Sequence, residues 1–262
     1  MSDDVPAIAD NEDFGNAVFR NMLEQFITPE VVKRQSEGTL PHPLHLEKGQ
    51  VIFRLDSSKP EIRINSEVKA IMKVALNKPV AMGDEVYTSD ITDIQGIVLQ
   101  DDEQDLGHYT FVKINGSFFV SFDFLYNKST ARELLALAEE YLEAARLCLD
   151  GNLIRPYVDN LFNACELAAR ARLAPDGELT KSHGSTHSKI NRHGKLGNVD
   201  GEYVQLFNTL SQLRSHVRYS GKNMEIKLPD HAVDIVRTQI ADLWWRYDQD
   251  RRKKELPLPS KP

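Results

Sequence analysis

Histidine and basic residues are concentrated in one stretch of the C-terminal half. Residues 181–222 contain seven Lys or Arg, two acidic residues and four of the eight histidines. This stretch carries +5, whereas the whole chain carries −7 at pH 7. A basic patch on an acidic protein is typical of a surface that binds an anion, such as RNA, a nucleotide or an acidic partner. We therefore place the candidate site in this stretch.

Arg214 and Arg218 are the first candidates for contact with an anion. They are four residues apart in a segment with helical apolar spacing, so they share a helix face and repel by about 0.2–0.5 kcal/mol unless a negative group lies between them. A phosphate would neutralise both arginines. A carboxylate from a neighbouring helix would do the same, with Tyr219 adding a hydrogen bond. The carboxylates considered are Glu139, Glu140 and Glu166.

The His-rich stretch before them is predicted to form a flexible, solvated basic rim that follows a phosphate backbone. The rim residues are Lys181, His183, Lys189, Arg192 and His193. Glycines at 184, 194 and 197 would keep the rim flexible, but their spacing matches neither a P-loop nor a dinucleotide fingerprint. A metal site on His183, His187 and His193 is the alternative. Because no acid or cysteine lies near them in sequence, we predict no metal and no cofactor.

The N-terminal half has the pattern of a small antiparallel β domain behind two helices. Residues 14–26 have the spacing of a short amphipathic helix. A second helix is predicted between Thr28, a suitable N-cap, and Gly38, with Pro29 at its first position. Apolar alternation then indicates strands at 51–55, 61–64 and 68–76, and about six strands in all.

A hairpin is the clearest local signal in this half. Asn115 and Gly116 tolerate positive φ and lie between two β-rich runs, which predicts a type I′ turn. The second run alternates so that four apolar residues share one face, which we expect to cover a core. These residues are Phe118, Val120, Phe122 and Phe124.

From Ser129 to about residue 248 the apolar period is helical. Helices are predicted at 131–149, 156–173, 202–219 and 231–247, with many alanines that allow close approach and with adjacent Trp244 and Trp245 facing inward and outward. Helices with short connections form an antiparallel bundle. The predicted fold is thus α+β, with a disordered acidic tail at 1–12, a β domain at 13–127, a bundle at 128–249 and a disordered tail at 250–262.

Composition narrows the setting of the protein. No apolar run approaches the roughly 18–20 residues that span a bilayer, and the acidic start lacks the order of a secretory signal. Cys148 and Cys165 lie in apolar helical patterns and are expected to be free thiols. We expect a cytoplasmic protein that does not contact membranes.

A series of features in the C-terminal half carries a family resemblance. An Ala-rich helix ends at Leu149-Asp-Gly151, and a second begins near Arg155-Pro-Tyr157 and includes residues 160–169. A Lys-x-His-Gly sequence follows at 181–184, and the last helix ends with Leu-Arg-Ser-His-Val-Arg-Tyr at 213–219. In this order the features resemble a HEPN domain (higher eukaryotes and prokaryotes nucleotide-binding). The β domain resembles no family in this way.

Many HEPN proteins are metal-independent ribonucleases, and the resemblance implies an Arg followed after four to six residues by His, where two protomers meet. Arg214 fits the arginine, but positions 219–221 hold Tyr, Ser and Gly, and His216 comes too early. A second HEPN subgroup carries Arg-x-x-x-Asp-Tyr. Arg214 and Tyr219 match it, while Arg218 replaces the acid. The standard ribonuclease mechanism therefore lacks its histidine.

The resemblance implies RNA or nucleotide binding, a homodimer through the bundle, and a role in bacterial defence, toxin–antitoxin or stress systems. We predict a catalytically divergent HEPN protein that binds RNA or nucleotide through Arg214, Arg218, Tyr219 and the basic rim. One alternative is a metal-independent endoribonuclease in which His183, His216 or Tyr219 acts with Arg214. The other is a non-enzymatic subunit whose β domain binds a protein partner while the bundle dimerises.

Overall fold

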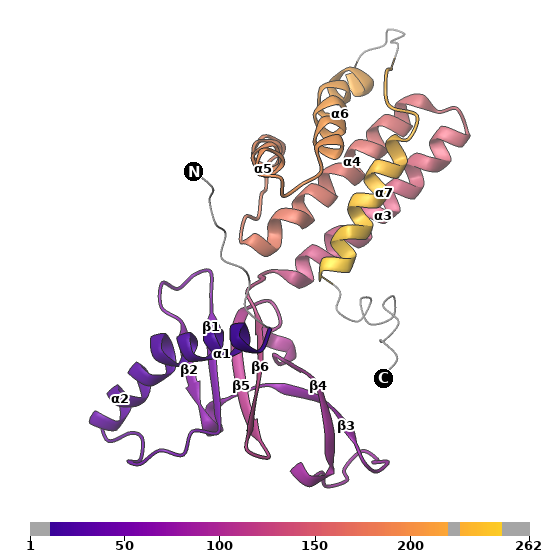
Figure 1. Ribbon diagram of the computed structural model, residues 1–262. Helices are drawn as coiled ribbons and strands as arrows, with labels where there is room; N and C mark the ends of the chain where they lie inside the picture. Colours follow the sequence, from indigo (N-terminus) through magenta and orange to yellow (C-terminus); the bar gives the residue numbers. More distant parts are fainter. Residues whose placement is uncertain (1–10, 220–225, 248–262) are drawn as a thin grey trace, which may run out of the picture. The chain divides into compact units, whose positions relative to one another are not determined.

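A computed structural model describes residues 11–219 and 226–247, and the chain divides into two units, residues 1–124 and 125–262 (Figure 1). The first unit combines helices with antiparallel sheets, and the second is helical, as predicted. The expected disordered tails fall mainly outside the described residues. Asn11 and Glu12, expected in the first tail, belong to a helix.

The first unit begins with one continuous helical segment instead of two capped helices. Helix α1 (Asn11–Met22) passes through a π turn (Leu23–Ile27) into α2 (Thr28–Ser36). The prediction that Thr28 is an N-cap is wrong, because Ile27 before it has helical dihedrals and Thr28 donates its N–H to the carbonyl of Leu23, five residues back. A π turn changes the bonding pattern just before Pro29, which has no N–H to donate.

Six antiparallel strands follow, in two sheets (Figure 1). The larger sheet has the order β2-β1-β5-β6, and the smaller pairs β3 with β4. Asn115 and Gly116 both have positive φ, 50° and 84°, which confirms the predicted hairpin between β5 and β6. The strands are β1 (Lys48–Phe53), β2 (Glu61–Ile64), β3 (Ile71–Leu76), β4 (Ile91–Val98), β5 (Gly107–Ile114) and β6 (Ser117–Asp123).

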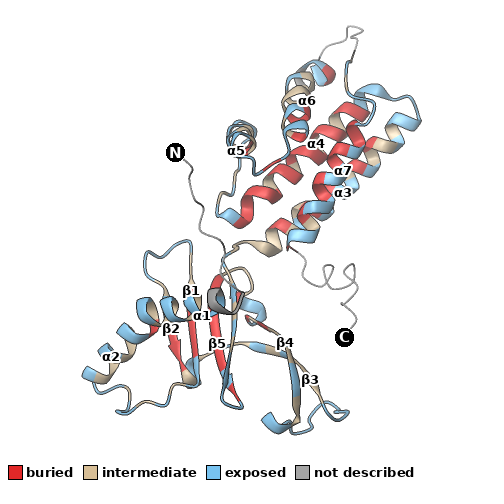
Figure 2. Ribbon diagram, viewed as in Figure 1, coloured by how far each residue is buried: buried red, intermediate tan, exposed pale blue. Residues whose placement is uncertain are grey.

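The core of this unit lies on β1 and β5, where Val51, Tyr109 and Phe111 are buried under the leading helices (Figure 2). The expectation that the β6 face covers a core is confirmed only in part, because Phe118 and Phe124 contact Phe111 and Phe53 but the face stays half exposed. Phe118, Val120, Phe122 and Phe124 are 39–51% exposed. The alternation was read correctly, since Phe122 pairs with Tyr109 on the same face. However, β6 is the edge strand of this sheet, so its side chains are covered from one side only. Of the β6 rings, that of Phe118 contacts Phe19 of α1.

The other face of the larger sheet carries a row of polar residues that are paired with one another. Arg63, Gln50 and Thr110 are cross-strand neighbours. Arg63 donates from Nη1 and Nη2 to both oxygens of Glu103, at 2.7 and 2.5 Å, and from Nη1 to Gln50 at 3.0 Å. Hydrogen bonding to Arg63 lowers the pKa of Glu103 and outweighs the opposing effect of burial. The pair is therefore ionised inside the sheet domain.

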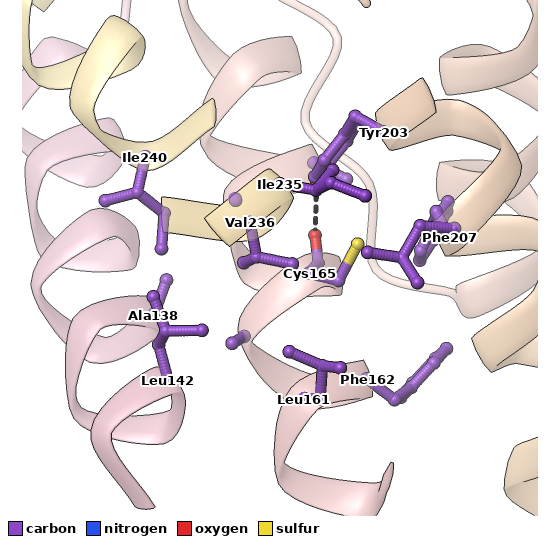
Figure 3. Close-up of a cluster of buried hydrophobic side chains, with 14 of the residues drawn as sticks. Ala138, Leu142, Leu161, Phe162, Cys165, Tyr203, Phe207, Ile235, Val236 and Ile240 are labelled. Atoms are coloured by element: carbon purple, nitrogen blue, oxygen red, sulfur yellow. Dashed lines mark hydrogen bonds between the residues drawn. The ribbon is translucent and has the colours of Figure 1, made fainter. Parts of the chain in front are cut away.

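The described part of the second unit contains five α-helices. The α3–α4 pair forms its base, with α7 against both and α6 against α4 (Figure 1). Figure 3 shows Val236 and Ile240 of α7 near Ala138 of α3, and Tyr203 of α6 donating a 2.5 Å hydrogen bond to the Cys165 carbonyl. The helices are α3 (Lys128–Asp150), α4 (Ile154–Leu173), α5 (His183–Lys195), α6 (Gly201–Tyr219) and α7 (Ala232–Tyr247).

The segment expected to be a flexible rim is the helix α5. Ser182 caps it by accepting a hydrogen bond from the N–H of Ser185 at 3.3 Å. Its buried face is Thr186, Ile190 and His193, at the i, i+4, i+7 spacing of an amphipathic helix. The pattern escaped detection because Ile190 is the single aliphatic residue on this face.

Candidate functional site

The site is built around Arg214, near the end of α6. Its guanidinium lies over the ring of Phe162 from α4, 4.5 Å from the ring centroid, which is a cation–π contact. Its Nη1 lies 2.9 Å from Nε2 of His183. Its Nε is buried and has no hydrogen-bond partner among the residues that the structure describes. A cation held in this way keeps its charge while its position is fixed by the aromatic ring.

His183 connects Arg214 to a buried carboxylate. It is the first residue of α5, and its Nδ1 is hydrogen-bonded to Oε1 of Glu166. Nη1 of Arg214 is closer to Nε2 than to Nδ1, at 2.9 against 3.4 Å. The consistent arrangement is a neutral imidazole whose Nδ1–H donates to Glu166, with Nη1 of Arg214 close to both ring nitrogens. The His183 side chain is nevertheless 57% exposed, so a ligand can reach it.

Glu166 is the buried anchor of this chain of contacts. Its side chain is 6% exposed and accepts a 2.8 Å bond from Nη2 of Arg170 in addition to the bond from His183. Glu166 is thus in contact with Arg170 and His183, and the imidazole lies between Glu166 and Arg214. No carboxylate lies within 4 Å of Arg214 in the part of the chain described by the structure.

Two stacked phenylalanines support these polar groups. The rings of Phe162 and Phe207 are 6.0 Å apart and nearly parallel, and both are almost fully buried. The ring of His183 lies 6.0 Å from Phe162, and that of His187 lies 5.8 Å from Phe207. The site therefore rests on a packed apolar layer that restricts side-chain movement.

Arg218 shares a face with Arg214 as predicted, but its charge is already matched. Its Nε and Nη2 bond both oxygens of Asp159 of α4, at 2.6 and 3.0 Å. The hydrogen bond to Asp159 raises the pKa of Arg218. The idea that one phosphate joins Arg214 and Arg218 is thus not supported, because a carboxylate occupies the second guanidinium.

His216 and Tyr219 do not join Arg214. His216 is two residues away, a spacing at which helical side chains do not face each other, and its Nδ1 lies 3.4 Å from the Gln212 carbonyl of its own helix. The side chain of Tyr219 is 85% exposed and does not close the cluster around Arg214. Of the histidines weighed as substitutes in a nuclease, the structure therefore brings only His183 to Arg214.

Most of the predicted basic rim converges on another carboxylate. Arg192 bonds Glu178, and Nζ of Lys189 and Nε2 of His193 each lie 3.5 Å from its Oε2. Burial alone would raise the pKa of Glu178, but the hydrogen bond from Arg192 and the surrounding positive charges lower it. His193 is buried, contrary to the expected solvated rim. Lys181 is exposed, as expected.

The carboxylates at positions 159 and 178 were missed by sequence reasoning, whereas Glu166 was among the candidates considered. Asp159, Phe162, Glu166 and Arg170 recur every three or four residues on α4, a spacing that places them on one helix face. That periodicity was the available signal for Asp159. Among residues 11–219 and 226–247, no group of three or more His, Cys, Asp or Glu is arranged to hold a metal ion.

The fold and site together define a helical bundle with an Arg–His–carboxylate chain on one side. The family model of the HEPN domain matches residues 131–240. The C-terminal unit thus contains a HEPN domain. A comparison with curated proteins gave no match. None of the described helices is both long and apolar enough to cross a membrane.

Proposed function

We propose that the HEPN domain binds the phosphate of RNA or a nucleotide at Arg214. The observation that carries this proposal is the contrast between two arginines one helical turn apart. Asp159 neutralises Arg218, whereas no carboxylate of the described residues lies within ion-pair distance of Arg214. A fixed guanidinium without a direct counter-ion is a ready anion site, because its N–H groups match phosphate geometry.

The electrostatic balance of the site fits an anionic ligand. Arg170 and Arg214 contribute two positive charges and Glu166 one negative charge, so the cluster carries a net +1 with His183 neutral. A phosphate would reverse that excess and would offer an acceptor to the guanidinium. The exposed imidazole of His183 lies at the same place.

Binding of labelled single-stranded RNA by the full chain tests this proposal. Arg214→Ala is compared with Arg146→Ala, because Arg146 is an exposed arginine on α3 that pairs with Glu143 and Asp150 and whose loss removes the same charge. Arg214→Ala should weaken affinity by about tenfold or more, roughly 1.4 kcal/mol. Arg146→Ala should change it less than about twofold. Equal effects of the two substitutions, with unchanged thermal unfolding, would remove Arg214 from the site.

Ribonuclease activity is the second candidate, and the position of His183 favours it. A carboxylate that orients an imidazole beside an arginine is an arrangement suited to general base catalysis with stabilisation of a phosphate. With a phosphate bound to Arg214, Nε2 of His183 can accept the proton of a ribose 2′-hydroxyl. Cleavage lost in His183→Ala but kept in His216→Ala is the expected pattern. Loss in His216→Ala alone would contradict it.

Dimerisation through the bundle is part of the proposal. Leu137 and Leu147 of α3 and Trp245 of α7 are 41–58% exposed, while Trp244 packs against the core. Exposed large apolar side chains on neighbouring helices are suited to an interface. Light scattering of wild type and Trp245→Glu should show a dimer that the substitution weakens. A role in defence, toxin–antitoxin or stress systems is a proposal that follows from the resemblance alone, and a protein partner for the β domain is the alternative proposal.

A further inference from the structure

The carboxylates around the site limit how many phosphates it can accept. Of the cations predicted to bind phosphate, Lys189, Arg192 and His193 converge on Glu178, and Arg218 pairs with Asp159. A surface that follows a nucleic-acid backbone needs a series of cations that exchange counter-ions for successive phosphates. Here Arg218 is neutralised by Asp159, and Glu178 offsets one of the two positive charges of Lys189 and Arg192.

The acids also lie where neighbouring phosphates of a backbone would pass. Arg218 is one turn of α6 beyond Arg214, about 5–6 Å away, so Asp159 lies close to the next position along that helix. Glu178 is bonded to Arg192, nine residues after His183 and thus roughly 13 Å along α5. A phosphodiester tract that runs along α6 past Arg214 and Arg218 would approach Asp159, which disfavours this mode of binding.

Of the residues predicted to bind phosphate, three are not within ion-pair distance of Glu178 or Asp159: Lys181, His183 and Arg214. Arg214 and His183 are in contact. Lys181 is exposed two residues before His183, and no carboxylate of the described residues pairs with it. Arg214 and His183 can therefore face one phosphate group, and Lys181 is the exposed cation nearest to His183 in the sequence.

We propose that this site takes a single terminal phosphate, a phosphate monoester at the end of an RNA chain or on a mononucleotide, instead of the internal phosphodiester backbone. This inference rests on the proposed function and narrows its ligand. A monoester presents more negative charge and more oxygens to Arg214 than a diester does. A terminal phosphate is also joined to a nucleoside on one side only, so the rest of the ligand can extend away from Asp159.

Binding of five probes to the full chain tests the inference. They are AMP, adenosine, and one hexa-adenylate RNA with a 5′-phosphate, with a 3′-phosphate, or with hydroxyls at both ends. AMP and at least one phosphorylated RNA should bind about tenfold or more tighter than adenosine and the unphosphorylated RNA. Comparison of the 5′- and 3′-phosphates identifies which end is bound. The logarithm of affinity should fall with the logarithm of salt concentration with a slope of about 1 or less.

Arg214→Ala, run with every probe, separates failure of the inference from failure of the proposed function. Tight binding of the unphosphorylated RNA, with a salt slope of several and a strong loss in Arg214→Ala, would overturn the single-phosphate inference and leave the proposed function standing. This is also the result that an internal ribonuclease requires. Binding that Arg214→Ala does not change, or no binding of any probe, would overturn both.

Discussion

Nη1 of Arg214 lies 2.9 Å from Nε2 of His183, although the two residues are 31 positions apart in the chain. The contact joins the end of α6 to the start of α5, and through Nδ1 of His183 it reaches Glu166 on α4. Three helices thus meet at one imidazole. The histidine that the HEPN ribonuclease motif places after its arginine is absent from positions 219–221. His183, which comes from another helix, instead lies beside Arg214.

Replacing Glu166 by Gln should separate binding from catalysis. The substitution removes one negative charge beside Arg170 and His183, so affinity for a phosphate ligand should stay the same or rise by severalfold. Any RNA cleavage should fall by about 10²–10⁴, because His183 loses the carboxylate that orients it. Binding and cleavage are measured on the same samples. A parallel loss of both would mean that Glu166 supports only the fold.

Asp159→Asn should release a second arginine. Without the carboxylate, Arg218 becomes a free cation one turn from Arg214. Affinity for an unphosphorylated single-stranded RNA should then increase severalfold, and the salt slope should grow by about 0.7. Asp150→Asn is the matched control, because Asp150 pairs with Arg146 on the exposed side of α3. An unchanged slope would show that Asp159 does not restrict the site.

Acid should weaken the N-terminal unit through its arginine-paired glutamates. Hydrogen bonds from Arg63 and Arg34 lower the folded-state pKa values of Glu103 and Glu67 below the ordinary 4.5. A lowered folded pKa gives stability that is complete above pH 4.5 and is lost as pH falls through the lower value. The protection factors of the β1 and β5 amides, which correct for the intrinsic pH dependence of exchange, should therefore fall below about pH 4.5.

Glu103→Gln provides the comparison for this acid effect. At pH 7 it should cost about 1–3 kcal/mol, because buried Arg63 keeps its charge but loses the charged acceptor. Its stability should also change less between pH 5 and pH 3 than that of wild type. Identical pH dependence in the two proteins would show that the Arg63–Glu103 pair is not a source of the acid sensitivity.

Two strand glycines form a matched test of packing in the N-terminal unit. A Cβ on Gly49 of β1 would lie 2.3 Å from the Phe111 ring, whereas a Cβ on Gly96 of β4 would meet nothing within 4 Å. Gly49→Ala should destabilise the unit by about 1–3 kcal/mol, because Phe111 fills the space in the core. Gly96→Ala should cost less than about 0.5 kcal/mol. Denaturant unfolding of both variants makes the comparison, and equal stabilities would contradict the close contact.

The features predicted best are those that depend on residues close to one another in the sequence. Asn115-Gly116 specifies a turn locally, and the alanines of α3 and α4 indicated close helix packing, with Ala138 and Ala168 fully buried. Composition gave less guidance for α5, because one aliphatic residue and two buried polar ones form its inner face. Thr28 failed as a cap because the helix before it continues through a π turn.

The site was predicted in part for the same reason. Its arginines follow a helical period that can be read from one segment, so Arg214 and Arg218 were correctly placed on one face. Their partners come from other elements: His183 from α5, and Glu166 and Asp159 from α4. Whether a given cation is free or neutralised is a tertiary property, and net charge over a segment does not reveal it. Asp159 and Glu178 therefore pair with four of the residues that were predicted to bind phosphate, which leaves fewer of them for a ligand.

The measurement that tests the central claim most directly is an NMR titration of the full chain with AMP. It follows the arginine Nε–H and histidine ring signals, with Arg214→Lys and His183→Ala used for assignment. The Nε–H of Arg214 and the ring of His183 should shift together and saturate, while Arg192 and Arg218, held by Glu178 and Asp159, should change little. Shifts confined to Arg192 and the rest of α5, with Arg214 and His183 unchanged, would contradict the account.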